Sequence, residues 1–211
     1  MSPMPAMRRR IVGAPHPIIP GSVITSDRFS GANVTNIRNR ALDLGLGGSA
    51  KTWTQMVGTT NGIGITSEMA VRSGTGNARR YNLDAGTGNV YTSVKIVTKP
   101  TQNFLYMVVR GDGNDGPSAS WYGVRFSIAA AQLFKSIGGT LTGLGLALAI
   151  ADGTTVGIKV EGSDVALYAN GLLFNSVTDT SIPDTNHGVG FQHNTTGDGF
   201  VLDDYLVANV A

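Results

Sequence analysis

The sequence predicts an all-β protein built as an antiparallel two-sheet sandwich. The clearest evidence is the stretch 156–177, VGIKVEGSDVALYANGLLFNSV, in which apolar residues alternate with polar or small ones. A period of two is typical of strands with one buried face. The dipeptides Gly162-Ser163 and Asn170-Gly171 divide the stretch into three runs, and both suit the tight primed turns of hairpins. We therefore expect a three-stranded antiparallel meander here.

Composition favours β structure elsewhere in the chain as well. Glycine accounts for 29 of 211 residues, about twice the usual share of roughly 7%. Glutamate occurs only at Glu68 and Glu161, so good helix formers other than alanine are scarce and helices are not expected. A chain of this length can bury roughly 70% of its extended surface in one core. The chain has no cysteine, which excludes disulfides and thiolate sites.

Short candidate strands follow one another after residue 25 at a spacing of about ten residues. They cover 63–71, 78–83, 90–98, 104–110, 122–128, 132–135, 142–150, the meander, 188–193 and 200–209. Many short strands with turn signals between them indicate a sandwich or jelly roll. No linker divides them, so residues 25–211 are assigned to one domain.

Residues 1–24 differ from the rest and are expected to form an extended arm. They hold five of the eight prolines, which remove backbone donors and favour extended conformations. A floppy terminus and a peptide that docks on a neighbouring subunit both fit this composition. The residues assigned to an assembly arm in the second case are Arg8, Arg9, Arg10, Ile11, Val12, Ile18 and Ile19.

Charge argues against a nucleic-acid-binding surface. The formal net charge is +2, from 16 basic and 14 acidic residues, and three of the basic residues are the arginines of the arm. The remaining body is close to neutral and lacks the clustered Lys and Arg that nucleic acids require. The longest apolar stretch, 144–151, is far shorter than the roughly 20 residues of a membrane span. We expect neither nucleic acid nor membrane as a partner.

A longer pattern resembles a known family. Asp27-x-Phe29 is followed by Trp53, the meander, Val177-Thr-Asp, Gly188-Val-Gly-Phe and finally Phe200-x-Leu-Asp-Asp-Tyr. In this order residues 26–209 resemble concanavalin A-like, laminin-G-type jelly rolls, especially those of bacteriophage virion proteins. The resemblance implies two packed sheets of six or seven strands, one of them concave, with ligands of sugar-binding members on the concave face or its rim loops. Lectins, hydrolases and structural virion parts share this fold, so it does not fix the function.

The acidic residues show no catalytic pair. Hydrolases of this superfamily commonly carry Glu-x-Asp-x-x-Glu on one strand, where alternating carboxylates act as nucleophile and acid. This run is absent, and Glu68 and Glu161 lie far apart in the chain. Asp203 and Asp204 are adjacent, so in a strand they point to opposite faces. We therefore expect no enzyme, and a glycoside hydrolase with unusual acids is the third hypothesis.

Trp121 and Tyr122 are the candidate glycan-binding residues. Aromatic rings stack on sugars when they are exposed. Adjacent residues of a strand face opposite sides, so one of the pair is expected in the core and the other on the surface.

The loop 110–116, RGDGNDG, concentrates oxygen ligands. Asp112, Asn114 and Asp115 are candidate calcium ligands, because calcium prefers several oxygens. A plain glycine-rich hairpin loop is the alternative interpretation. No other cofactor is predicted.

Together these features predict a non-enzymatic bacteriophage virion protein, a minor tail protein in the first instance and a capsid accessory or decoration protein in the second. The arm would attach it to other virion proteins, in multiple copies of a symmetric assembly. The jelly roll would face outward and bind host-surface polysaccharide. The expected location is the virion, assembled in the cytoplasm of a bacterial host. The alternative is a carbohydrate-binding, lectin-like module without a virion role.

Overall fold

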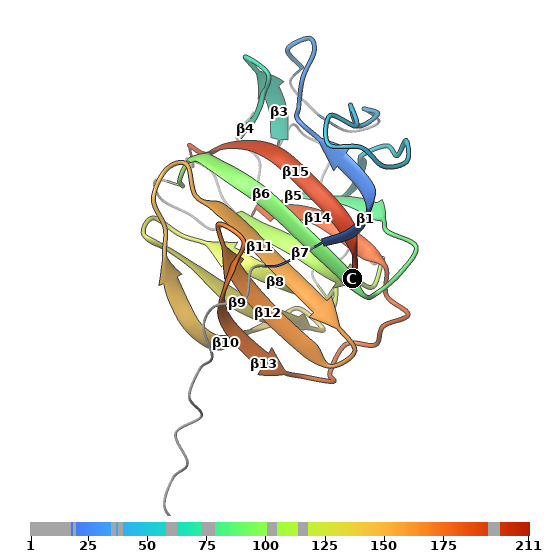
Figure 1. Cartoon of the computed structure of the whole chain (residues 1–211), viewed down its shortest axis with the longest axis vertical. Helices are drawn as coiled ribbons and strands as arrows, with labels where there is room; N and C mark the ends of the chain where they lie inside the picture. Colours follow the sequence, from blue (N-terminus) through green and yellow to red (C-terminus); the bar gives the residue numbers. More distant parts are fainter. Residues whose placement is uncertain are drawn as a thin grey trace, which may run out of the picture.

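The structure, a computed structural model, describes residues 18, 20–34, 37, 40–57, 63–72, 79–100, 105–113, 118–193 and 199–211. These residues form strands, turns and loops but no helix, as the composition predicts. Accordingly, the described part of the chain contains no helix that could cross a bilayer. All strand pairs are antiparallel, and the strands form two sheets packed face to face (Figure 1). The predicted all-β, two-sheet sandwich is confirmed.

The first sheet has eight strands and contains the predicted meander at one edge. From that edge its order is β13 (Leu172–Thr178), β12 (Asp164–Ala169), β11 (Thr155–Glu161), β6 (Val90–Thr98), β15 (Val201–Val210), β4 (Met69–Arg72) and β3 (Ile63–Thr66), with β1 (Pro20–Asp27) also paired to β15. The turn between β12 and β13 has positive φ at Asn170 (49°) and Gly171 (79°), which a type I′ turn requires.

The second sheet has seven strands. Its order is β10 (Thr140–Ala149), β9 (Ala130–Ile137), β8 (Trp121–Phe126), β7 (Leu105–Gly111), β14 (Gly188–His193), β5 (Arg79–Asp84) and β2 (Thr54–Val57). β14 comes late in the chain but lies between β7 and β5. The last residues of β5 and β7 and the first residue of β14 therefore meet at the same rim of this sheet.

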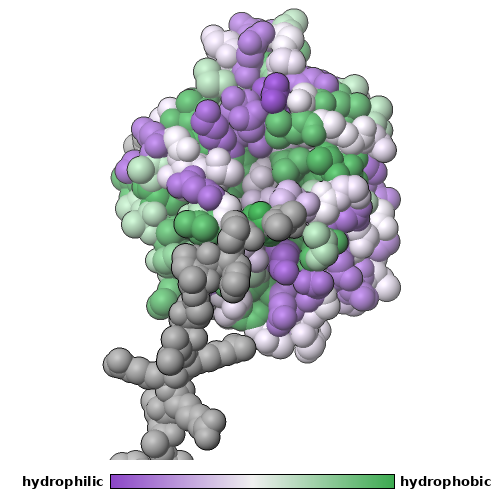
Figure 2. Space-filling view, viewed as in Figure 1, coloured by the Kyte–Doolittle hydropathy of each residue, from purple (hydrophilic) through white to green (hydrophobic). Residues whose placement is uncertain are grey.

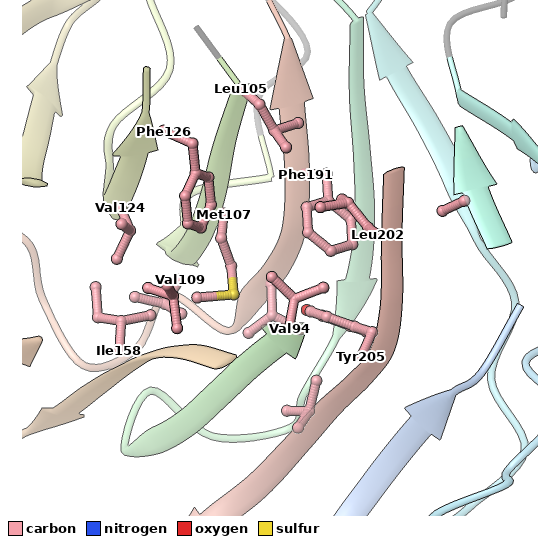
Figure 3. Packing of buried hydrophobic residues seen from close by; sticks show 14 of the residues in the cluster. Val94, Leu105, Met107, Val109, Val124, Phe126, Ile158, Phe191, Leu202 and Tyr205 are labelled. Atoms are coloured by element: carbon pink, nitrogen blue, oxygen red, sulfur yellow. The ribbon is translucent and has the colours of Figure 1, made fainter. Parts of the chain in front are cut away.

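Alternate side chains of the two sheets form one apolar core between them (Figure 3). This is the period-two burial that the sequence predicts for strands with one inward face. The ten core residues labelled in Figure 3 are fully buried: Val94, Leu105, Met107, Val109, Val124, Phe126, Ile158, Phe191, Leu202 and Tyr205.

The boundary between arm and domain lies earlier than predicted. β1 begins at Pro20, which lies opposite Val210, and Val23 lies opposite Ala208. Residues 20–24 are thus part of the sandwich and not of the arm. The prediction extended the arm too far because it took Pro20 as a sign of non-strand structure, whereas proline is tolerated as the first residue of a strand.

Ile18, one of the residues assigned to the assembly arm, contacts its own chain. Its N–H donates to the Gly171 carbonyl (2.7 Å), and its side chain packs against Tyr91 and Tyr168 on the outer face of the eight-stranded sheet. The other residues assigned to the assembly arm lie outside the described residues: Arg8, Arg9, Arg10, Ile11, Val12 and Ile19.

The long connection between β1 and β2 lies at one end of the sandwich (Figure 1) and is fixed by a buried carboxylate. Asp27 is fully buried and accepts hydrogen bonds from the Trp53 indole N–H (2.7 Å) and the Phe29 backbone N–H (2.7 Å). It also pairs with the Arg40 guanidinium at 2.5 Å. The motif residues Asp27, Phe29 and Trp53 therefore meet in space.

Asp43 fixes the same connection and makes it sensitive to acid. Burial alone raises the pKa of its carboxyl, but backbone N–H groups of Arg28 and Gly45, together with Ser30, outweigh burial and lower the pKa to about 2. The folded chain therefore binds this proton less readily than the unfolded chain does. Its contribution to stability is present above pH ~4 and is lost as the pH falls toward ~2.

We expect Asp43→Asn to lower the free energy of unfolding by about 1–2 kcal/mol near pH 7 and by much less near pH 2. Urea unfolding at both pH values measures this difference. Asp164→Asn, at an exposed position in β12, is the matched control and should change stability little at either pH. Equal losses for Asp43→Asn at both pH values would contradict the assignment.

Candidate functional site

A pocket of about 370 Å³ opens at the rim of the seven-stranded sheet. It lies where β5 and β7 end and β14 begins, with β2 and the connection before β14 completing its wall. The polar residues that line it are Thr54, Asn82, Asp84, Asp112, Thr185, Asn186 and His187.

Two glycines shape the floor of the pocket. Gly188 of β14 pairs with Gly111 of β7 on one side and with Asp84 of β5 on the other. A Cβ on Gly188 would lie 2.8 Å from the Gly111 carbonyl oxygen, so only glycine allows this close approach. The Asn82 amide occupies the space that side chains would fill, since its Nδ2 lies 3.1 Å from the Cβ position of Gly188.

Asn82 has an unpaired acceptor. Its side chain lines the pocket and the residue is only 6% exposed, yet its Oδ1 has no hydrogen-bond partner in the protein. A buried acceptor left unpaired costs about 1–3 kcal/mol. A hydrogen-bond donor on a ligand would remove this cost if the amide turned toward the pocket, because the oxygen is closed to solvent in the free protein.

The rim carries two carboxylates. Asp84 Oδ1 accepts a hydrogen bond from the Gly86 N–H (2.8 Å) and lies 3.8 Å from His187 Nδ1, and the side chain is 79% exposed. Asp112 Oδ2 accepts from the Ser120 N–H at 2.7 Å, which holds the loop after β7 against β8. Both acids are thus oriented by local backbone bonds and can still present oxygen to a ligand.

Of the three candidate calcium ligands, only Asp112 belongs to the described residues, and Asn114 and Asp115 lie outside them. Within the described ranges, no three His, Asp or Glu side chains come together in a way that could hold a metal ion. The calcium site therefore stays a prediction, and the pocket is described by its hydrogen-bonding groups.

Trp121 and Tyr122 face opposite sides of β8, as predicted, but neither is exposed. Tyr122 is fully buried in the core, where burial raises its pKa to about 12, so the neutral hydroxyl donates to Asp179 (2.7 Å). Trp121 is 2% exposed and packs edge-on against Tyr106, with ring centroids 5.3 Å apart. The prediction that one of the pair would be exposed for stacking on a sugar is wrong, because the outer face of this sheet carries an apolar cluster of its own.

The residues that do line the pocket gave only weak signals in the sequence. Asp84 belongs to a turn signal, and Asn82 is one polar residue within a strand pattern. His187 is a lone histidine in the connection before β14, and a lone loop histidine gives no signal of a site. Their common site depends on β14 lying between β5 and β7, which no local pattern predicts.

Comparison with solved structures identifies the type of fold. No family model and no curated protein sequence matches the chain. Several solved structures do match it. A protein of unknown function with a galectin-like fold from Bacillus subtilis has a TM-score of 0.63 and 11% identity, over 90% of this chain and 97% of that one. The chain is a jelly-roll sandwich.

Two further matches are carbohydrate-related by name. The carbohydrate binding module CBM66 from Bacillus subtilis has a TM-score of 0.55 and 15% identity, over 74% of this chain and 95% of that one. An endo-β-1,3-glucanase from Pyrococcus furiosus has a TM-score of 0.59 and 13% identity, over 90% of this chain and 94% of that one. At such identities the similarity establishes the fold, and it agrees with the concanavalin A-like sandwich that the sequence resembles.

The comparison also corrects the expectation that the protein is not an enzyme. An endo-glucanase shares the fold over 90% of this chain, so the missing Glu-x-Asp-x-x-Glu run is no ground for excluding catalysis. The superfamily pattern places both acids on one strand, whereas Asp84 in β5 and Asp112 after β7 line one pocket from separate parts of the chain. None of the three structures is described as a phage protein, so the virion role and location stay predictions.

Proposed function

We propose that this protein binds carbohydrate in the rim pocket. The observation that carries the proposal is the unpaired acceptor of Asn82, buried among amides, hydroxyls and carboxylates. Each sugar hydroxyl can donate and accept at once. One hydroxyl can therefore donate to Asn82 Oδ1 once the amide, whose oxygen is closed to solvent in the free protein, turns toward the pocket. Other hydroxyls can bond to Asp84, Asp112 and Asn186 at the rim.

The size of the pocket and the fold support this assignment. About 370 Å³ falls within the range of roughly 300–1,000 Å³ that is usual for small-molecule sites. Two proteins of the same fold are named for carbohydrate binding and for action on a β-1,3-glucan. The ligand class is therefore a neutral polyhydroxylated molecule, and glycans are the class to screen.

The decisive variant is Asn82→Leu, which should separate binding from stability. It removes an unpaired buried acceptor and replaces it with an apolar group of similar size, so we expect the free energy of unfolding to stay the same or to rise by about 1 kcal/mol. Binding to a glycan found on an array should be lost. Calorimetry and urea unfolding measure the two effects on the same samples.

Asp84→Ala provides a second variant at an exposed position, with an expected tenfold weaker binding, about 1.4 kcal/mol. Asp164→Ala, exposed on β12 of the other sheet, is the matched control and should bind as the wild type does. Unchanged binding by both Asn82→Leu and Asp84→Ala would show that the glycan binds elsewhere.

The same samples should be assayed for hydrolysis, because a glucanase shares the fold and two carboxylates line the pocket. New reducing ends that disappear in Asp84→Asn and in Asp112→Asn would make the pocket a hydrolytic site. Binding without release of reducing ends would make it a recognition site.

A further inference from the structure

A buried arginine lies next to the rim pocket. Arg110 is only 2% exposed, whereas arginine side chains are almost never fully buried unless they are paired. It directly precedes Gly111 and Asp112, which line the pocket. Its hydrogen-bond partners therefore show what the buried charge holds in place beside the pocket.

A β-bulge turns this side chain toward the interior. The register of β7 against β14 shifts between Val108 and Gly111, so two residues of β7 lie opposite one of β14. Arg110 has a φ of 49°, which is uncommon for a residue other than glycine. Val108 belongs to the outer apolar cluster, and strict alternation would place Arg110 on that outer face as well. Backbone outliers of this kind persist only where the surrounding structure holds them, and they concentrate at functional sites.

The guanidinium of Arg110 holds two connections of the chain. Its Nε donates to the Gly88 carbonyl (2.8 Å) and its Nη2 to Asn89 Oδ1 (2.8 Å), both in the connection between β5 and β6. Its Nη1 donates to the Ile182 carbonyl (3.3 Å), in the connection between β13 and β14. These three acceptors are neutral oxygens, and burial lowers the pKa of the guanidinium. Because arginine stays protonated in proteins, the buried charge is stabilised by these bonds.

The two connections form opposite walls of the pocket. The first leaves β5 at Asp84, and the second reaches β14 through Asn186 and His187, and all three residues line the pocket. Figure 1 shows both connections at the right edge of the molecule, and Figure 2 shows mainly hydrophilic and intermediate residues there. The connections touch, since a Cβ on Gly88 would lie 2.1 Å from the Asp184 carbonyl oxygen. The guanidinium therefore holds both walls close to the point where they meet.

We propose that Arg110 is the positioning residue of the rim pocket. A guanidinium presents five N–H donors in a fixed fork, so one side chain can hold acceptors that lie in different directions. Groups that bind a ligand must be held within roughly 0.5 Å of their working positions. Arg110 fixes Asp84 on one wall relative to Asn186 on the other, and it does not itself contact the ligand. This inference rests on the proposed glycan site, but the hold on the walls can be measured without a ligand.

Hydrogen exchange of the full chain measures this hold. The Ala85 N–H donates to the His187 carbonyl (3.0 Å), so its exchange reports separation of the walls. In Arg110→Met, Ala85 should exchange about tenfold faster relative to the amides of β11, which report global unfolding. Arg110→Lys should have the same effect, because an ammonium keeps the charge but lacks the fork. Equal changes at Ala85 and in β11 would show that Arg110 only stabilises the whole fold, and would overturn the proposal.

Asn89→Ala keeps the test decisive if Arg110→Met does not fold. It removes one of the three acceptors and should speed exchange at Ala85 about threefold relative to β11. Arg125→Met is the matched control, because Arg125 lies in β8 of the same sheet and stacks on the Phe134 ring, 4.0 Å from its centroid. It should leave exchange at Ala85 unchanged. Unchanged exchange at Ala85 in Asn89→Ala and in every folded variant of Arg110 would overturn the proposal.

Calorimetry with a glycan that binds the wild type gives the second readout. Arg110→Met and Arg110→Lys should bind it about tenfold more weakly, and Arg125→Met should bind as the wild type does. Urea unfolding shows whether each variant is folded under the assay conditions. Unchanged affinity in folded Arg110→Met, for a glycan that Asp84→Ala binds more weakly, would overturn the proposal. If Asn82→Leu and Asp84→Ala both bind normally, the proposed glycan site fails, and exchange at Ala85 relative to β11 still decides the role of Arg110.

Discussion

Asp27→Ala is expected to lower the free energy of unfolding by about 3–5 kcal/mol, one of the two largest single effects in this chain. The carboxylate is fully buried, and its removal leaves the Trp53 indole N–H without its acceptor. Arg40 loses its buried partner and keeps the Ser30 carbonyl and Asp43. Trp53 is itself fully buried, with ring centroids 5.8 Å from Phe191 and 5.3 Å from Tyr205. Because those two rings come from different sheets, Asp27 fixes the residue that joins the sheets at this end.

Urea unfolding of Asp27→Ala, Asp27→Asn and the control Asp164→Ala measures the effect. Asparagine keeps an acceptor for Trp53 but removes the charge opposite Arg40, so an intermediate loss is expected. Asp164 is exposed, and its replacement should change stability by no more than about 0.5 kcal/mol. A loss below about 1 kcal/mol for Asp27→Ala would contradict this account.

The pH dependence of Asp27 has the opposite sign to that of Asp43. Burial raises the pKa of Asp27 above its usual value, against the lowering effect of the Trp53 hydrogen bond and of Arg40. The folded chain therefore binds this proton more readily than the unfolded chain does. The resulting contribution to the free energy of unfolding is fully present below pH ~4 and is lost as the pH rises through the folded-state pKa. The buried charge is a cost in itself, and removal of one partner is harmful because the other stays behind.

Local patterns in the sequence predicted the elements whose two faces differ. The meander was found with both of its turns, since alternation and the Asn170-Gly171 dipeptide are local signals. The hairpin of β3 and β4 was predicted as one strand from 63 to 71. Its turn uses Ser67 and Glu68 at φ of 52° and 60°, and these residue types rarely adopt a primed turn, so the sequence gives no turn signal there.

The pocket could not be predicted in the same way. Asn82, Gly111 and Gly188 lie in strands that become neighbours only because β14 inserts between β5 and β7. Alternation assigns a residue to a face but does not say which strands are adjacent. For the same reason, alternation correctly placed Trp121 and Tyr122 on opposite faces and could not show that both faces of β8 are covered.

Trp121→Ala is expected to destabilise the fold by about 3–5 kcal/mol and to leave glycan affinity unchanged in the folded protein. The indole packs over Gly123, where a Cβ would lie 3.1 Å from its Cζ3 atom, and edge-on against Tyr106. Alanine would leave a cavity within the apolar cluster on the outer face of the seven-stranded sheet. Trp121→Phe keeps part of this packing and should lose less stability.

Chemical unfolding and calorimetry on the same two variants separate the two roles that an aromatic residue on this sheet can have. A ring that stacks on a sugar contributes to affinity and costs little stability when it is removed, because an exposed ring buries little surface without ligand. A ring that is packed like that of Trp121 contributes to stability and not to affinity. If Trp121→Ala kept its stability and lost glycan binding, the aromatic cluster and not Asn82 would mark the site, and the rim pocket would be the wrong assignment.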